Sequence, residues 1–350
     1  MSRRRLLLLP LLVALALVVP LSSPGSAAPP VAGRDLTVMS RNIYLGSSLS
    51  PATSATTPAG FIGGVATVYG TMLFTNFPAR AKGLAAEVAK DQPDLIGLQE
   101  VARWSVTGPT GTPSLDYLAI LQGELAAKGL HYRVAAATDN ADIGPVPLVK
   151  PCASVTLGAC TVRYQDSDVI LARTDRPALT VGNPRTGTYA TQKVAATPVG
   201  TLSFDRGWAT VDGTLNGKAF RFASTHLETE DAPAIQQAQG REFRQVAAAP
   251  RAVIAVGDFN SATDGSTTTT YATLTDGYFK DAAANVGPTC CQNGTLTNTA
   301  SQLRTRIDLV LAHGAAQPVS AHRVGDVPFQ TAPPFWPSDH AGVVATLRIP

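Results

Sequence analysis

Six short apolar runs along the chain each adjoin a group of polar residues. The runs are four to six residues long; five are rich in Val, Ile and Leu, and the run at 220–223 is Phe-Arg-Phe-Ala, which is typical of buried β-strands with aromatic residues. They cover residues 36–39, 95–98, 220–223, 252–256, 309–312 and 342–347. Because rigid strands display reactive side chains at their ends, this pattern predicts a site built from strand ends.

Three other stretches repeat their apolar residues at helical spacing and predict helices over residues 79–90, 115–128 and 233–249. Asn216-Gly217 separates apolar segments at 208–211 and 220–223, which predicts a tight hairpin turn. A mixture of hairpins and strand–helix units favours a layered α/β fold over a purely parallel sheet.

The most informative polar group is Gly257-Asp258-Phe259-Asn260, directly after the run at 252–256. Asp258 and Asn260 are two residues apart, so their side chains project to the same side of an extended chain. The alternative is a strand that ends in an Asx turn, because Asp and Asn are common turn residues.

The other polar groups also lie at the ends of apolar runs. In chain order they are Asn42, Gln99-Glu100, His226, Asp308 and Ser338-Asp339-His340. A single polar residue at a strand end is common, whereas six such groups in one chain indicate a shared site.

In this order, the six groups resemble those of the endonuclease/exonuclease/phosphatase superfamily of deoxyribonuclease-I-like, metal-dependent phosphoesterases. The resemblance spans residues 36–348. It implies an α/β (α+β) fold, a four-layer sandwich of two mostly antiparallel β-sheets flanked by helices. It also implies a hydrolase acting on phosphoric diesters, with its site where the strand ends converge.

The resemblance implies a divalent cation held by Glu100, Asn42 and Asp339. We expect Mg²⁺, with Mn²⁺ or Ca²⁺ as alternatives, because hard cations take oxygen ligands. Glu100 as a plain surface acid and Asn42 as a turn former remain open.

The resemblance assigns the water-activating base to His340, oriented by Asp308. A neutral imidazole suits proton transfer near neutral pH. The alternative for Asp308 is an ion pair with Arg304 or Arg306.

Three further residues receive roles from the resemblance. Asp258 would position the nucleophile or handle a proton, and Asn260 would donate its amide to the phosphate. His226 would bind the phosphate or assist the leaving group. The other three histidines lack such a context and are expected to be structural: His131, His313 and His322.

Two residues depart from the family pattern. Arg41 stands where relatives often carry an aromatic or small residue, so the rim near Asn42 is expected to differ. Asp168 stands near the place of a Gly-Asn pair in many relatives and is a candidate for approaching the substrate.

Two apolar segments lie beside the predicted site. Residues 42–79 contain no charged side chain and carry apolar residues at helical spacing after Thr57-Pro58, a typical N-cap and first helical residue. This segment is either a helix packed on the core or a lid that faces lipid. The aromatic loop 327–337 precedes Asp339, and we expect Trp336 to bind substrate at its rim.

The first 28 residues predict a cleaved signal peptide, with Arg3-Arg4-Arg5 before a Leu-rich core and small residues at 26–28. A membrane anchor is the alternative. Ser2-Arg3-Arg4-Arg5 resembles a twin-arginine signal, but the Leu-rich core suits the general secretory route better. We expect a secreted, extracellular protein with residues 29–350 as a single domain.

The net charge of +3 comes from the three arginines of this peptide, so residues 29–350 carry 25 basic and 25 acidic side chains. The remainder therefore lacks the basic excess of a tight nucleic-acid binder.

The four cysteines suggest disulfides in an exported protein. A local Cys152–Cys160 bridge would leave Cys290 and Cys291 as an adjacent pair, and two cross-pairs are the alternative.

Within the phosphoesterase interpretation, the sequence favours a phospholipid or sphingomyelin-type substrate, as in bacterial sphingomyelinases, because the segments beside the site are apolar. The main alternative is a nuclease, in which Arg103, Arg163, Arg173, Arg185 and Arg206 would form a basic stripe. A catalytically inactive binding protein is a remote alternative. No stable protein partner is expected, and the chain is expected to be a monomer.

Overall fold

The computed structural model of this chain describes residues 34–109, 111, 113–149 and 159–350. The predicted signal peptide and Cys152 lie outside the described residues. None of the helices in the described part is long and apolar enough to cross a membrane.

The first sheet has eight strands within the described residues. Seven follow the order β15-β18-β1-β2-β6-β3-β4, and β5 also pairs with β6. Among the strand pairs of this sheet in the described residues, only β1 and β2 are parallel. The strands are β1 (Asp35–Asn42), β2 (Leu95–Gln99), β3 (Arg103–Thr107), β4 (Ser114–Asp116), β5 (Tyr132–Pro147), β6 (Thr161–Arg173), β15 (Gln317–Val324) and β18 (Gly342–Arg348).

The second sheet has six strands in the order β13-β14-β12-β11-β10-β7. Here β11 and β12 are parallel and their neighbours antiparallel. The strands are β7 (Leu179–Thr188), β10 (Gly207–Leu215), β11 (Lys218–His226), β12 (Ala252–Asp258), β13 (Lys280–Asp281) and β14 (Asp308–His313). Two separate hairpins complete the strands: β8 (Lys193–Thr197) with β9 (Gly200–Phe204), and β16 (Gln330–Thr331) with β17 (Pro334–Phe335).

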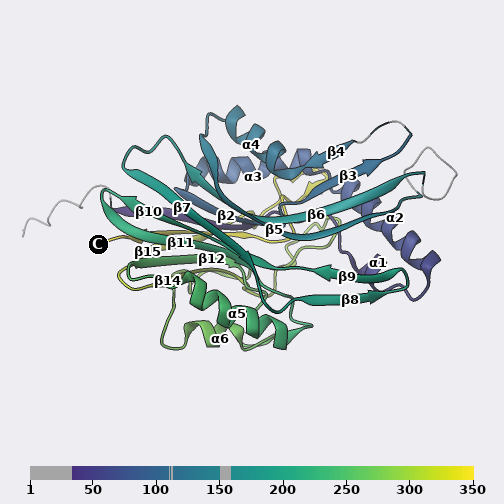
Figure 1. The fold of residues 1–350 in the computed structure, drawn as a ribbon. Coiled ribbons are helices and arrows are strands. Elements are labelled where there is room, and N and C mark those ends of the chain that lie inside the picture. The colour runs from purple at the N-terminus through teal and green to yellow at the C-terminus, as the bar shows by residue number, and fades with distance from the viewer. Residues whose placement is uncertain (1–33, 110, 112, 150–158) are drawn as a thin grey trace, which may run out of the picture. The chain divides into compact units, whose positions relative to one another are not determined.

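Helices cover the outer faces of the two sheets. Figure 1 shows α3 and α4 on one side of the sheets and α5 and α6 on the other. The helices are α1 (Ser50–Thr53), α2 (Pro58–Phe74), α3 (Phe77–Asp91), α4 (Tyr117–Ala127), α5 (Pro233–Ala247) and α6 (Thr270–Thr275).

Three apolar cores separate the four layers, because successive residues of each strand point to opposite faces. In β12, Ile254 and Val256 enter the core between the sheets, whereas Val253 and Ala255 pack with α5 and α6. Strand β6 alternates in the same way, with Ile170 facing the other sheet. The four-layer sandwich of two mostly antiparallel sheets is therefore confirmed.

The uncharged segment folds as α1 and α2, which pack on the first sheet. Thr57 caps α2 by accepting the N–H of Gly60, and Pro58 is the first helical residue. Phe61, Val65 and Val68 are buried in the helix-side core.

The three other predicted helices form as α3, α4 and α5, with α4 beginning two residues later than expected because residues 114–116 pair as β4.

The hairpin turn forms where Asn216-Gly217 predicts it, between β10 and β11. Both residues have positive φ, 49° and 76°, which is the conformation that Asn and Gly adopt most readily.

Candidate active site

One edge of the second sheet carries three polar side chains in a row. The parallel pairing of β11 and β12 places His226 opposite Asp258, and the antiparallel pairing of β12 and β14 places Asp258 opposite Asp308. All three side chains are almost completely buried. Strand register therefore brings together residues that are far apart in the sequence.

Gly257 allows this close packing of the strands. A Cβ at this position would lie 2.1 Å from the backbone oxygen of Thr225 on β11, and its φ is +156°. Any side chain here would push β12 away from β11, so the glycine before Asp258 is required by the fold.

Asn42 joins the two sheets at the site. It ends β1, where it lies beside Gln99 of β2 in the parallel register. Its amide nitrogen donates to Glu100 Oε1 and to Asp258 Oδ2, both at 3.1 Å, and its oxygen accepts the N–H of Tyr44. We name the residues that meet here the polar cluster; they are Asn42, Glu100, His226, Asp258, Asn260, Asp308, Asp339 and His340.

His340 and Asp308 form a direct pair. Nδ1 of His340 lies 2.8 Å from Asp308 Oδ2, and Oδ1 of Asp308 is buried without a hydrogen-bond partner among the described atoms. Burial acts to lower the pKa of His340, but Asp308, Asp258 and Asp339 outweigh it and hold that pKa well above its ordinary value. Nε2 of His340 faces Asp258 Oδ2 at 3.7 Å. The alternative for Asp308, an ion pair with Arg306, does not form, because Arg306 pairs with Asp281.

The cluster is crowded with carboxylates. Burial raises the pKa of Asp258 to about 7, against the opposing charge of His340, and Asp308 and Glu100 add to the rise. Burial also raises the pKa of Asp339 to about 6, with Glu100 adding to it. A divalent cation among these oxygens would relieve the repulsion, so the donor set fits a hard cation.

Three ligand atoms come within 4.8 Å of one another in two groups of the described residues: Asp258, Asp308 and His340, and Cys290, Cys291 and His340. Glu100 and Asp339 belong to neither group. Glu100 accepts from Asn42 and, through Oε2, from the N–H of Leu45 at 2.7 Å. The structure thus holds an Asp/His group suited to a metal ion, and it places two of the three predicted ligands, Asn42 and Glu100, in contact.

Arg206 fixes the protonation of His226. Its guanidinium lies 2.8 Å from Nδ1 of His226, and because guanidinium can only donate, Nδ1 must accept and Nε2 carries the proton. Burial, with help from Arg206 and His340, holds the pKa of His226 well below its ordinary value. His226 is therefore a neutral ring that donates a hydrogen bond from Nε2. Because its pKa is low, it does not carry the additional proton that a general acid would give to the leaving group.

Asn260 takes part in an Asx turn and also directs its side chain to the polar cluster, the two roles that its motif suggests. Its backbone N–H donates to Asp258 Oδ1 at 2.9 Å, which is an Asx turn. Its side-chain nitrogen lies 3.1 Å from His226 Nε2 and donates to the backbone oxygen of Leu227. The turn is therefore the local structure that aims the amide at the site.

Two buried arginines position the loop that carries His340, and sequence reasoning missed both roles. Arg41 pairs with Glu87 at 2.9 Å and donates to the backbone oxygen of His340 at 2.6 Å. Arg80 donates to the backbone oxygens of Ile43 and Pro337. Arg41 was expected to alter the rim near Asn42, but it lies inside the protein. The available signal was an arginine within an apolar strand, which requires a buried partner.

Trp336 does not form the substrate-binding rim that its loop predicts. It is 2% exposed, packs with Tyr44 and Leu296, and donates from Nε1 to the backbone oxygen of Asn298. Apolar contacts and an internal partner for the indole N–H stabilise the buried position. The loop's Phe329 lies against Gly83 of α3, away from the polar cluster.

Asp168, His313 and His322 differ in burial: Asp168 lies inside the protein, His313 is half-buried and His322 is exposed. Asp168 is completely buried, and burial together with Asp166 raises its pKa well above the ordinary range. His313 contacts the backbone oxygen of Tyr278, and His322 pairs with Asp91.

A cleft of about 760 Å³ opens beside the polar cluster. Its lining includes Asn260 and Arg206. Its charged lining residues are balanced: Lys193, Arg206, Arg304, Glu228, Glu230 and Asp231. Of the five arginines considered for a basic stripe, Arg206 alone lines this cleft in the described structure; Arg163 and Arg173 pair with Asp142 and Asp175.

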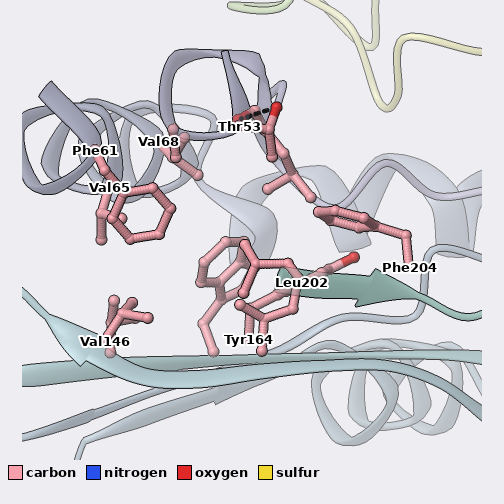
Figure 2. Close-up of a pocket in the computed structure, with 13 residues that line it drawn as sticks. Thr53, Phe61, Val65, Val68, Val146, Tyr164, Leu202 and Phe204 are labelled. Atoms are coloured by element: carbon pink, nitrogen blue, oxygen red, sulfur yellow. Dashed lines mark hydrogen bonds between the residues drawn. The ribbon is translucent and has the colours of Figure 1, made fainter. Parts of the chain in front are cut away.

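An apolar cavity of about 50 Å³ adjoins the cleft. Figure 2 shows Val65 and Val68 of α2 above Val146 of β5 and Tyr164 of β6, with Phe204 of β9 at one side. Three residues line both spaces: Leu49, Thr53 and Phe204. The polar cleft and the apolar cavity are therefore neighbours that share a wall.

The adjacent cysteines are joined to each other. Cys290 and Cys291 form a disulfide, which rules out the alternative of two cross-pairs. Cys160 is buried, but Cys152 lies outside the described residues, so the Cys152–Cys160 pairing stays a prediction.

The four-layer sandwich and a cluster of carboxylates, amides and histidines at its strand ends define a phosphoesterase-type fold and site. The sequence profile of the Endonuclease/Exonuclease/phosphatase family matches residues 68–340, and the chain belongs to that family. It is a hydrolase of phosphoric esters. Among curated proteins, none matches the chain in sequence.

Several solved structures share the fold. An endonuclease/exonuclease/phosphatase from Beutenbergia cavernae is 22% identical, with a TM-score of 0.53 over 90% of this chain and 72% of that one. D. rerio TDP2, complexed with a single-strand DNA product, is 17% identical, with a TM-score of 0.55 over 90% and 99%. A Bacteroides thetaiotaomicron mannosyl-6-phosphatase is 15% identical, with a TM-score of 0.55 over 89% and 99%. At these identities the likeness concerns the fold alone.

Proposed function

We propose that this protein is a secreted, divalent-metal-dependent phosphodiesterase that hydrolyses a phospholipid or sphingomyelin-type diester. The observation that carries the substrate class is the wall shared by the polar cleft and the apolar cavity. The basic, Leu-rich N-terminal sequence supports secretion.

His340 is the base that activates water. Its Nδ1 donates to Asp308 Oδ2, so that the ring, once Nε2 has lost its proton, is held in the tautomer whose Nε2 accepts a proton from water. Asp308 stabilises the imidazolium that results. Its backbone is held by Thr289, whose Oγ1 accepts the N–H groups of Ile307 and Asp308. This pair provides the general-base step of the hydrolysis.

The phosphate is bound by donors on the opposite side of the cluster. His226 presents a neutral ring with its proton on Nε2, because Arg206 occupies Nδ1. The amide of Asn260 lies beside that nitrogen. The positive charge on this side belongs to Arg206. It stabilises negative charge on the phosphoryl oxygens in two ways: it orients the N–H of His226 toward them, and its own charge attracts them at longer range.

Asp258 handles a proton or positions the attacking water. Its pKa of about 7 lets it exchange a proton near neutral pH, and its Oδ2 faces both His226, at 3.5 Å, and His340, at 3.7 Å. This position lets Asp258 exchange a proton with His340, while the N–H of His226 faces the same carboxylate oxygen.

Glu100, Asn42 and Asp339 would hold the cation, with Mg²⁺ as the expected ion. A bound divalent cation supplies charge stabilisation for the phosphoryl oxygens and for the leaving oxygen. The raised pKa values of Asp258 and Asp339 support this assignment, because burial, with a smaller contribution from Glu100 and Asp308, disfavours their charged forms, and a bound cation would offset that cost.

An amphiphilic substrate fits the two adjoining spaces. Its phosphodiester would lie in the balanced polar cleft and the first methylene groups of its apolar part in the cavity behind Phe204. The β8–β9 hairpin, which carries Phe204, also exposes Val194 and Val199, at 62% and 50%. Exposed apolar side chains beside a site are suited to a lipid surface.

The test is hydrolysis by the purified protein of sphingomyelin and phosphatidylcholine in mixed micelles, and of DNA, each with Mg²⁺ and with EDTA. We expect release of a water-soluble phosphorylated headgroup that requires the metal. Cleavage of DNA with no release of headgroup would overturn the lipid proposal in favour of a nuclease. Absence of hydrolysis of all three substrates in Mg²⁺ and Mn²⁺ would overturn the phosphodiesterase proposal.

A further inference from the structure

The disulfide between Cys290 and Cys291 lies in the wall of the cleft. Cys290 is buried and Cys291 is exposed, and both line the cleft together with Asn260. The backbone of Cys290 is held by Thr305, whose oxygen accepts its N–H, and by Arg304, whose N–H donates to its oxygen.

The same segment is joined to the loop that carries His340. The N–H of Ala341 donates to the oxygen of Thr289, and the N–H of Gln292 donates to the oxygen of Asp339, each at 2.8 Å. The residues on either side of the disulfide thus bond to the residues on either side of His340. These backbone bonds do not depend on the S–S bond, so they keep the sulfur atoms near the imidazole when that bond is opened.

The sulfur atoms and the imidazole are close enough to share one ion. Sγ of Cys291 lies 3.8 Å from Nε2 of His340, and the ligand atoms of Cys290, Cys291 and His340 all lie within 4.8 Å of one another. Two thiolates and an imidazole are the ligands that Zn²⁺ and Cd²⁺ prefer, unlike the oxygen ligands of the proposed Mg²⁺ site. A disulfide offers no thiolate, so the oxidised protein lacks this ligand set.

We propose that reduction of Cys290–Cys291 creates a second metal site, specific for a thiophilic cation such as Zn²⁺ or Cd²⁺, with His340 as its third ligand. The cation takes Nε2, the nitrogen from which water would be activated, and so inhibits the enzyme. The inhibition, but not the metal site, rests on the proposed function.

The reductant is a dithiol. One of its thiolates attacks the exposed Sγ of Cys291, the S–S bond breaks, and Cys290 leaves as a thiolate. The second thiol of the reductant then displaces Cys291 from the mixed disulfide. Two electrons and two protons have passed to the cysteines, and the dithiol has become a disulfide. Binding of the cation releases the two thiol protons.

The site can be tested without an activity assay. The full protein, oxidised or reduced and then freed of reductant under anaerobic conditions, is titrated with Cd²⁺ while the ultraviolet thiolate-to-metal absorption is recorded. We expect one equivalent to bind to the reduced protein and no such absorption from the oxidised protein. Uptake that is the same before and after reduction would overturn the proposal.

Variants distinguish this site from the other cysteines. Cys291→Ser should abolish the absorption, whereas Cys160→Ser should retain it, with circular dichroism confirming that each variant is folded. His340→Gln should weaken Cd²⁺ binding at least about tenfold, because it removes a ligand. Absorption that survives in Cys291→Ser would place the site elsewhere and refute the assignment.

The inhibition is measured separately, as the rate of diester hydrolysis in Mg²⁺ with and without one equivalent of Zn²⁺. We expect a loss of at least about tenfold in the reduced enzyme and none in the oxidised enzyme. If the metal binds but the reduced enzyme keeps its full rate, His340 is not the base and the inhibitory part fails. If the protein hydrolyses no diester, the absorption experiment still decides whether the metal site exists.

Discussion

The polar cluster and the apolar cavity adjoin each other, yet they are built in opposite ways. The cluster consists of strand ends whose positions follow from pairing: His226, Asp258 and Asp308 stand in one row because β11, β12 and β14 are in register. The cavity has no such frame. It forms where α1 and α2, two long strands and a separate hairpin pack against one another.

This difference indicates how the two regions tolerate change. A side chain in the cluster is fixed by backbone hydrogen bonds and by buried arginines, so a substitution there alters chemistry without altering the frame. A side chain of the cavity is fixed by packing alone, and its replacement alters shape. We therefore expect the cluster to set the rate and the cavity to set the choice of substrate.

The largest effect should come from removing the cation or its main ligand. EDTA should abolish hydrolysis, and Mg²⁺ or Mn²⁺ should restore it; Glu100→Gln should lower kcat by more than ~100-fold. Glu124→Gln on α4 is the matched control and should leave kcat unchanged. Full activity after exhaustive dialysis against EDTA would refute the metal requirement.

The next largest effect should come from Asp308→Asn, which keeps the shape of the side chain but removes its charge. We expect kcat to fall by about 10²–10⁴, because the amide misdirects the imidazole tautomer. Asp308 raises the pKa of His340, so its loss should lower that pKa and shift the acid limb of the activity profile to lower pH. An acid limb that stays in place would show that the two residues are not coupled.

Arg206→Gln should have a moderate effect. Loss of a charge-assisted contact should raise KM by about 10- to 100-fold, while kcat falls less. Arg206 helps to hold the pKa of His226 low, so its removal should raise that pKa, as followed by NMR titration. Arg185→Gln, on β7 away from the cleft, is the control. The contact is not functional if both variants behave alike.

The smallest effect should come from filling the cavity. Val146→Phe should lower kcat/KM for a long-chain lipid about tenfold and leave a water-soluble diester unaffected, because apolar pockets discriminate by ~1–3 kcal/mol. Val106→Phe provides the control. Val106 of β3 and Val146 of β5 both pair with Val162 of β6, on the two edges of that strand, but Val106 does not line the cavity. Equal losses on both substrates would mean that the cavity does not contact the lipid.

The sequence predicted the frame of the cluster well. Strand ends and turn residues can be recognised locally in the sequence, so Asn42, Asp258, Asp308 and His340 were identified in advance. The pairing register of the strands then brings these residues together. The Asx turn at Asp258 was offered as the alternative to a functional motif, and the structure contains both, because the turn is what aims Asn260.

Contacts between distant segments could not be predicted. Nothing near Trp336 in the sequence shows that Tyr44 and Leu296 bury it, and nothing near Arg206 shows that it fixes the tautomer of His226. The burial of Arg41 follows from a partner, Glu87, that lies 46 residues further along the chain. These are tertiary contacts. Local composition shows at most that a buried partner is needed, as for Arg41 in an apolar strand, and does not show which residue supplies it.

The central claim is that His340 and Asp308 act as one base. The most direct test is kcat for the wild type, His340→Ala, Asp308→Ala and the double variant, measured on a water-soluble diester that bypasses the apolar cavity. Because both single variants disable the same step, the three losses should agree within about tenfold. Losses that multiply in the double variant would contradict the claim and would leave Asp258 as the group that activates water.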